Sequence, residues 1–180
     1  MDTFELALNE SLLVLGGARS GKSRYAERIA ELVDLPKIYV ATAEPRDSEM
    51  TARIAEHQRR RTSSWDTLEE AYEVPAVIQD HVSRECTILV DCLTIWLSNL
   101  MLADRNIDEE VTALLKAIQD FRGRLILVSN EVGFGIVPDN KLGREFRDLS
   151  GSVNQQVAAC ADRVQFIIAG YPMNLKARDN

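Results

Sequence analysis

The stretch Ser11-Leu12-Leu13-Val14-Leu15-Gly16-Gly17-Ala18-Arg19-Ser20-Gly21-Lys22-Ser23 decides the fold. Its first part, Leu12 to Leu15, is apolar without alternation, which is typical of a parallel strand buried on both faces. After Lys22, apolar side chains recur at helical spacing, as at Tyr25 and Ile29, and predict a helix. A glycine-rich turn therefore joins a strand to a helix. It matches the phosphate-binding pattern Gly-x-x-x-x-Gly-Lys-Ser, the Walker A motif.

This loop predicts a site for a nucleoside triphosphate. Backbone N–H groups of such a loop and the start of the following helix hold phosphates, while the lysine reaches the β- and γ-phosphates and the serine holds Mg²⁺. We therefore expect Lys22 at the phosphates and Ser23 at the metal. The alternative is an ordinary strand-to-helix turn that is glycine-rich by chance. The residues expected to contact the phosphates are Gly16, Gly17, Ala18, Arg19, Ser20, Gly21, Lys22 and Ser23.

Length and composition predict one soluble domain over residues 1–180. Hydrophobic residues make up 46% of the chain and charged residues 27%, which is ordinary for a globular protein. No apolar run is long enough to cross a bilayer, and residues 1–10 lack the basic start and apolar core of a signal peptide. We therefore expect no membrane span and a cytoplasmic location.

Cysteine, histidine and charge limit the kinds of site. Cys86, Cys92 and Cys160 are scattered and odd in number, which favours reduced thiols over disulfides or a thiolate metal site. The chain has only 2 histidines, so a zinc site is not expected. The net charge of −7 disfavours a broad surface for nucleic acid, and we expect no nucleic-acid partner.

Strand and helix patterns alternate along the chain. The N-terminal extension 1–10 alternates apolar and polar residues over 3–8 and can form an edge strand. The alternation predicts an α/β fold: a single-domain P-loop NTPase (RecA-like) with a doubly wound, mostly parallel sheet and helices on both faces. The other expected strands cover 12–15, 37–41, 65–68, 87–91, 125–129 and 164–168, and the expected helices cover 22–33, 48–61, 74–82, 93–102, 108–121 and 140–160.

Asp91 ends the apolar strand 87–91, which is the position of the acid that orders water around Mg²⁺ in P-loop enzymes. Four apolar residues followed by an acid are common by chance, so a solvated carboxylate at a strand end is the alternative. Alongside the phosphate loop, the pattern favours a metal role for Asp91.

His57 lies on the expected helix 48–61, on one stripe with Met50 and Ile54. By spacing alone it is an ordinary packed or partly exposed histidine. Arginines crowd the same helix and suit a polyphosphate, although a solvated face is the alternative. Their charge would disfavour the imidazolium and leave a neutral nitrogen able to attack phosphorus. These arginines are Arg53, Arg59, Arg60 and Arg61.

Several motifs in a fixed order resemble those of a known family. They are Gly16-Gly17-Ala18-Arg19-Ser20-Gly21-Lys22-Ser23, Tyr39-Val40-Ala41-Thr42-Ala43, Glu49-Met50-x-x-Arg53-Ile54-x-x-His57, Asn130-Glu131-Val132-Gly133-x-Gly135-Ile136-Val137-Pro138 and Phe146-Arg147-Asp148-x-x-Gly151-x-x-Asn154-Gln155. Over about residues 12–168, the chain resembles the bifunctional adenosylcobinamide kinase/adenosylcobinamide-phosphate guanylyltransferases of cobalamin assembly. It departs from the family at Glu56, where some relatives carry a second histidine, and in the extension 1–10, which relatives largely lack.

The resemblance implies two reactions on one scaffold. The first transfers a phosphoryl group from ATP or GTP to adenosylcobinamide, and the second transfers GMP from GTP to the new phosphate through a covalent GMP adduct of His57. The resemblance also implies Mg²⁺ as cofactor and a homo-oligomer, which is a trimer in the family. Beyond the phosphate loop, the implied GTP contacts are Ala41, Thr42, Ala43, Gln58, Arg59, Arg60, Arg61, Glu69 and Asp91.

Two other functions stay open on the sequence. One is a P-loop kinase of another small hydroxyl compound, with His57 as a structural residue. The other is a RecA-like ATPase module that acts on DNA or a partner protein, which would require a basic stripe that the net charge of −7 does not favour.

Overall fold

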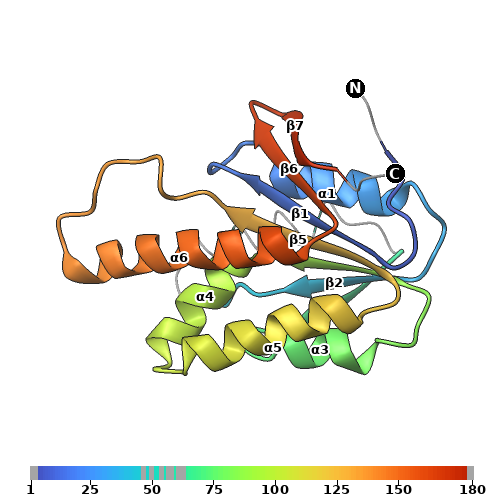
Figure 1. Cartoon of the computed structure of the whole chain (residues 1–180), viewed down its shortest axis with the longest axis horizontal. Coiled ribbons are helices and arrows are strands. Elements are labelled where there is room, and N and C mark those ends of the chain that lie inside the picture. The colour runs from blue at the N-terminus through green and yellow to red at the C-terminus, as the bar shows by residue number, and fades with distance from the viewer. Residues whose placement is uncertain are drawn as a thin grey trace.

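The computed structural model describes residues 4–45, 48, 51–52, 55, 59 and 64–177. Within them, one sheet has the strand order β3-β2-β4-β5-β1-β6-β7. The strands are β1 (Glu10–Gly16), β2 (Lys37–Ala41), β3 (Trp65–Glu69), β4 (Thr87–Asp91), β5 (Arg124–Asn130), β6 (Arg163–Ile168) and β7 (Tyr171–Lys176). The helices labelled in Figure 1 are α1 (Lys22–Glu31), α3 (Val74–Asp80), α4 (Leu93–Leu102), α5 (Ile107–Asp120) and α6 (Lys141–Cys160).

Two apolar layers hold the helices on the sheet. Because neighbouring residues of a strand point to opposite faces, Leu12 and Val14 pack with α1 on one face, and Leu13 and Leu15 pack on the other. That second face carries α3, α4, α5 and α6 (Figure 1). Buried parallel strands need apolar residues on both faces, which explains the unbroken apolar run of β1. The expected α/β fold with helices on both faces is confirmed.

The sheet order makes β1 the place where the chain changes direction. All strand pairs are parallel except β6 with β7, so the carboxyl ends of β1 to β6 share one edge. From β1 the chain crosses by α1 to β2, whereas from β5 it crosses by α6 to β6, on the other side of β1. Ligands of open α/β sheets bind outside the strand ends at such a switch point, and the glycine-rich loop follows β1 there.

The N-terminal segment differs from the sequence prediction. Residues 4–7 form no strand, and Leu8 and Asn9 form a turn, so the expected edge strand over 3–8 is wrong for its described part. Leu6 is instead buried in the α1 layer, and its carbonyl accepts a hydrogen bond from Arg124 Nε. The apolar alternation therefore reflects side chains that cover the start of the sheet, without a backbone ladder.

Strand β7 was not predicted, and the last expected strand was 164–168. Ala169 (φ 51°) and Gly170 (φ 85°) form a two-residue turn, after which β7 pairs antiparallel with β6. Positive φ at both central residues is the geometry of a type I′ hairpin. The turn lies next to the phosphate loop, so this missed element bears on the site.

None of the helices in the described part of the chain has both the length and the apolar character needed to cross a bilayer. Cys86, Cys92 and Cys160, all described, are free thiols, as expected. Of the expected helix 48–61, the described residues Ser48, Thr51, Ala52, Ala55 and Arg59 are helical, whereas Met50, Ile54 and His57 lie outside the described residues.

Candidate active site

The glycine-rich loop runs from the carboxyl end of β1 to the first turn of α1. Gly21 has φ 101° and directly precedes α1, where its carbonyl accepts the first helical hydrogen bond from Tyr25 N at 2.9 Å. A left-handed φ of this size suits glycine, because a side chain would be strained there. The backbone N–H groups at the start of α1 have no carbonyl of an earlier turn to bind, and they are available to an anion.

Two neighbouring segments support the loop. Glu131 N, just after β5, donates to Gly16 O at 3.0 Å, and Gly170 N of the β6–β7 turn donates to Ser20 O at 2.8 Å. A Cβ on Gly16 would lie 2.6 Å from Ile167 O and 2.8 Å from Ser20 Oγ. The close approach of β6 therefore requires glycine at position 16.

Gly16→Ala is expected to destabilise the loop, because its methyl group would overlap a backbone carbonyl that cannot move without disturbing β6. Overpacking of this kind costs about 1–3 kcal/mol. We expect a lower midpoint of urea unfolding and weaker binding of a fluorescent GTP analogue. Gly17→Ala is the matched control, since a Cβ on Gly17 would meet no atom within 4 Å. Equal behaviour of the two variants would contradict this account.

Lys22 is held inside the loop. The residue is only 7% exposed, and Nζ donates a hydrogen bond of 2.7 Å to Gly17 O, five residues earlier. An ammonium with three donors can keep this bond and still offer a proton to phosphate. The Ser20 hydroxyl is buried and has no hydrogen-bond partner among the described residues. The helix start, a fixed cation and a buried hydroxyl without a partner among the described residues together fit a triphosphate.

Asp91 stands at the end of β4, two strands from the loop. β5 lies between β4 and β1, which puts the strand ends about 10 Å apart. Tyr39 Oη donates to Asp91 Oδ2 at 2.8 Å, and the Tyr39 ring packs edge-on against Trp65 at 5.8 Å. This hydrogen bond fixes one carboxylate oxygen.

The charges of Asp91 and Lys22 both affect the pKa of the buried Cys92 thiol. Burial raises the pKa of the Cys92 thiol to about 12; the adjacent Asp91 carboxylate adds to the rise, and the Lys22 ammonium opposes it. Both charges therefore act on one buried thiol. A hard cation such as Mg²⁺ prefers carboxylate, hydroxyl, water and phosphate oxygens, and Asp91 and the Ser23 hydroxyl supply ligands of this kind beside the loop.

Asp91→Asn is expected to reduce turnover at limiting Mg²⁺ by about 10–100-fold, the usual cost of losing a group that orients a metal's ligands. The Mg²⁺ optimum should rise, because the amide keeps the shape of the carboxylate but not its charge. The measurement is the rate of product formation across a Mg²⁺ titration. An unchanged titration curve would give Asp91 a purely structural role. Tyr39→Phe removes the hydrogen bond to the Asp91 carboxylate but keeps the charge of Asp91. We therefore expect it to shift the Mg²⁺ titration less than Asp91→Asn does.

Thr42 joins the ends of β2 and β4. It is fully buried; its hydroxyl accepts from Cys92 N at 2.8 Å and donates to Cys92 O at 2.9 Å. Asn99 of α4 donates to Thr42 O at 2.8 Å. In this structure the Thr42 side chain therefore holds the backbone that carries Asp91. Its expected contact to GTP stays a prediction.

The other expected contacts lie further along the same edge. Ala41 ends β2, and Ala43 lies two residues further on. Glu69 ends β3, four strand spacings or about 19 Å from β1. Arg59 is helical and exposed. The segment between β2 and β3 contains His57, Gln58, Arg60 and Arg61, which lie outside the described residues. The structure thus brings the loop and Asp91 together, and the roles of these other residues stay predictions.

Sequence reasoning missed three contributors to the site. Tyr39 was expected only as a residue of the strand 37–41 and of a motif, and its bond to Asp91 depends on strand register, which one sequence does not give. Asn99 is a polar residue in an apolar helix, a signal that was available. Gly170 follows an apolar run and precedes Tyr171, which is also a hairpin signal.

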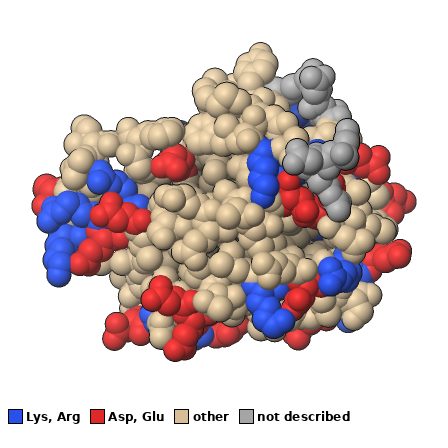
Figure 2. Space-filling model, viewed as in Figure 1, with Lys and Arg blue, Asp and Glu red and all other residues tan. Residues whose placement is uncertain are grey.

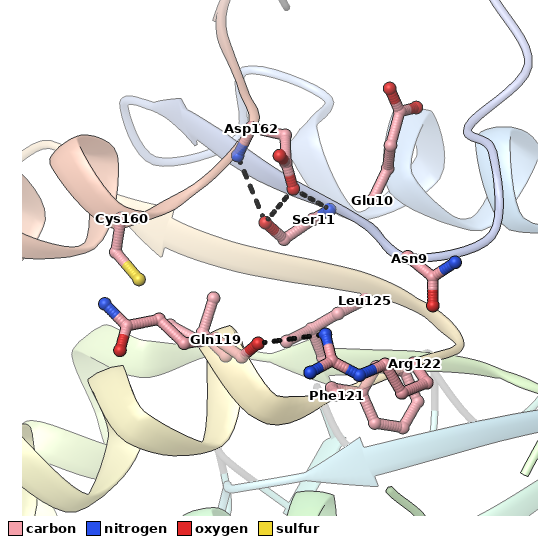
Figure 3. A pocket seen from close by; sticks show the side chains of 10 residues that line it. Asn9, Glu10, Ser11, Gln119, Phe121, Arg122, Leu125, Cys160 and Asp162 are labelled. Atoms are coloured by element: carbon pink, nitrogen blue, oxygen red, sulfur yellow. Dashed lines mark hydrogen bonds between the residues drawn. The ribbon is translucent and has the colours of Figure 1, made fainter. Parts of the chain in front are cut away.

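A hollow lies at the edge of the sheet opposite the phosphate loop, near the starts of β1 and β5 (Figure 3). It measures about 270 Å³, and Asp162 and Cys160 lie on its wall. Asp162 Oδ2 accepts from both Ser11 N and Ser11 Oγ at 2.8 Å. These groups satisfy one another and join β1 to the start of β6. We therefore assign them a structural role.

Comparison with known proteins identifies the family. The family described as "Cobinamide kinase / cobinamide phosphate guanyltransferase" matches residues 12–175. The chain belongs to this family. It is 48% identical over 166 residues to the bifunctional adenosylcobalamin biosynthesis protein CobP of Pseudomonas aeruginosa, covering 91% of this chain and 96% of that protein. It is 39% identical over 181 residues to CobU of Salmonella typhimurium, another bifunctional adenosylcobalamin biosynthesis protein, covering 92% of this chain and 99% of that protein.

Solved structures support the fold of this family member. An ATPase from a bacterial type III secretion system aligns with a TM-score of 0.56 at 12% identity, covering 88% of this chain and 51% of that one. The flagellar accessory protein FlaH of Methanocaldococcus jannaschii aligns with a TM-score of 0.54 at 13% identity, covering 96% of this chain and 80% of that one. At such identities, the likeness concerns the fold alone.

Proposed function

We propose that one domain, residues 1–180, carries out both reactions named in the family description. It would phosphorylate the hydroxyl of adenosylcobinamide with ATP or GTP, and then transfer GMP from GTP to that phosphate, giving adenosylcobinamide-GDP and pyrophosphate. The observation that carries the proposal is the supported phosphate loop with Lys22 and Asp91 at one sheet edge, in a chain matched by the family over 12–175.

In the kinase reaction, the loop would hold the β- and γ-phosphates while the acceptor hydroxyl attacks in line. Phosphoryl transfer needs mainly positioning and charge stabilisation, and a buried lysine at a helix start offers both. Lys22 would share its protons between Gly17 O and the transferred group. Mg²⁺, held through Ser23 and Asp91, would neutralise charge on the phosphates.

In the guanylyl reaction, a nitrogen of His57 would attack the α-phosphorus of GTP, and pyrophosphate would leave. An oxygen of the acceptor phosphate would then attack the same phosphorus, and the N–P bond would break to free His57. We propose GTP contacts from Ala41, Thr42, Ala43, Gln58, Arg59, Arg60, Arg61 and Glu69, in addition to the loop and Asp91.

The deciding test is incubation of the purified protein with GTP labelled at the α-phosphate. Protein-bound label, released on addition of adenosylcobinamide phosphate, supports the proposal. A plain kinase of another hydroxyl compound would take no label from the α-position. A RecA-like ATPase module would instead hydrolyse nucleotide faster when DNA or a partner protein is added.

We also propose that the protein forms a homo-oligomer, a trimer as in the family, and that it works in the cytoplasm. Strand β7 supports association, because it is an edge strand on which Tyr171, Met173 and Leu175 are 69%, 47% and 54% exposed. Exposed apolar residues gathered on one edge are typical of interaction surfaces. Free thiols suit a reducing compartment. Light scattering coupled to size exclusion would give the mass of the assembly.

A further inference from the structure

A groove lies between α6 and the loop that follows β5. It measures about 440 Å³ and is separate from the hollow in Figure 3. Its lining comes from two of the sequence motifs to which the proposed reactions give no role. We call it the α6 groove; it is formed by Gly133, Arg147, Asp148, Gly151, Ser152 and Gln155.

The α6 groove lies at the same sheet edge as the phosphate loop. Gly133 is two residues after Glu131, whose N–H donates to Gly16 O at 3.0 Å. On α6, Asn154 donates to Asn130 O at 3.1 Å and accepts from Ser129 Oγ at 2.7 Å. Both walls of the groove are therefore attached to the end of β5, next to β1. A molecule in the groove would lie beside the phosphates.

Part of the groove lining is a glycine inside a helix. Gly151 lies in the middle of the 20-residue helix α6, where glycine lowers helix stability relative to alanine. A Cβ there would meet no atom within 4 Å, so packing of the fold does not explain the glycine. Open space at this position suits the close approach of a flat ligand.

The walls combine hydrogen-bond donors and acceptors. Arg147 and Asp148 make an ion pair at 3.5 Å, with the Asp148 side chain 73% exposed. The Gln155 amide makes no side-chain hydrogen bond with the described residues, and it offers two donors and one acceptor oxygen. Charged side chains of both signs gather over the first half of α6, at the left of Figure 2. Such a lining suits neutral amide groups, which need both kinds of partner.

The loop that contributes Gly133 to the groove also carries exposed apolar side chains. Phe134 and Ile136 are 85% and 97% exposed, and the Phe134 ring lies 6.0 Å from that of Phe166 in β6. Large exposed apolar side chains beside a polar groove are typical of a binding surface for a ligand with apolar faces and a polar rim.

We propose that the α6 groove binds the macrocycle of the corrinoid acceptor. A corrin ring is flat and apolar on its faces, and carboxamides surround it. Only the tethered hydroxyl, or its phosphate, needs to enter the crevice at Lys22, so the ring must rest on a surface beside it. The inference rests on the proposed function and assigns the acceptor site within it.

The test uses the full-length protein with Gly151→Phe, which fills the groove. Self-labelling by α-labelled GTP needs no corrinoid, so label and the KM for GTP should stay as in the unchanged protein. The KM for adenosylcobinamide in the kinase reaction should rise by at least about tenfold, the equivalent of 1.4 kcal/mol of binding. Gln155→Ala, which removes one neutral hydrogen bond, should raise it by about two- to tenfold.

Ala159→Phe is the matched control, because Ala159 is exposed on α6 one turn beyond Gln155 and outside the groove lining. It should leave both KM values unchanged. An unchanged KM for the corrinoid in Gln155→Ala and in a folded Gly151→Phe protein would overturn the inference while the function stands, as would an equal rise in the control. Absence of both label and kinase activity in the unchanged protein would overturn the proposed function, and the inference with it.

Discussion

Lys22→Ala is expected to abolish both phosphoryl and guanylyl transfer while the protein stays folded. Both reactions need the triphosphate fixed in the loop, and Lys22 is the cation that this loop holds at 7% exposure against Gly17 O. Losing one donor aimed at developing charge costs about 10²–10³-fold in kcat. The alanine also frees Gly17 O and loosens the loop, so the loss should be at the upper end. Initial rates of both reactions and the far-UV circular dichroism of the variant are the measurements.

Lys37→Ala is the matched control for this experiment. Lys37 begins β2 at the other edge of the sheet, is 8% exposed, and donates to Leu35 O at 3.0 Å. It shares the burial and the type of partner of Lys22, but it has no phosphate to bind. We expect Lys37→Ala to lose some stability and to keep kcat. Near-normal kcat in folded Lys22→Ala protein would refute the assignment of the loop.

The central strands were predicted closely because their physics is local. β2 and β4 run between the same residues in the structure as in the prediction, and helix α4 also has its expected bounds. In the two strands, the apolar runs 38–41 and 88–90 are each bounded by polar residues. A strand buried on both faces needs apolar side chains on both faces, so its sequence is a nearly continuous apolar run. The apolar run in the sequence is then enough to locate the strand.

The edges of the sheet were predicted poorly because their residues are partly exposed. β7 mixes exposed Tyr171, Met173 and Leu175 with Pro172, a composition that does not distinguish an edge strand from a loop. The segment 3–8 alternates like a strand, yet Leu6 is held by its carbonyl bond to Arg124 and by burial. Such outcomes depend on distant partners, which a local pattern does not contain.

The site also has a part that the sequence predicted and a part that only the fold shows. The loop residues and Asp91 follow from a contiguous motif and a strand end, so the sequence predicted their location at one sheet edge. The support of Asp91 by Tyr39 depends on β2 and β4 pairing with Ala41 opposite Asp91. The bonds of Thr42 to Cys92 depend on the same pairing. These contacts join residues about 50 positions apart, and only the folded sheet reveals them.

The second large effect concerns the covalent step, which separates the proposed function from that of a plain kinase. His57→Ala is expected to take no label from α-labelled GTP, because the nitrogen that would form the N–P bond is gone. Removing a nucleophile of this kind costs about 10⁴–10⁶-fold in kcat, so guanylyl transfer should fall below detection. Phosphorylation of adenosylcobinamide needs the loop and an aligned hydroxyl without a covalent adduct, and should survive in part.

The chemistry of the bond gives an independent check on this prediction. Label on the unchanged protein should be lost in acid and persist in alkali, as a phosphoramidate behaves and an acyl phosphate does not. His81→Ala is the natural control, since the chain has only 2 histidines and His81 lies just after α3, where its Nδ1 is 2.8 Å from Val77 O. His81→Ala should therefore keep the label. Equal label in His57→Ala and the unchanged protein would exclude His57 as the nucleophile.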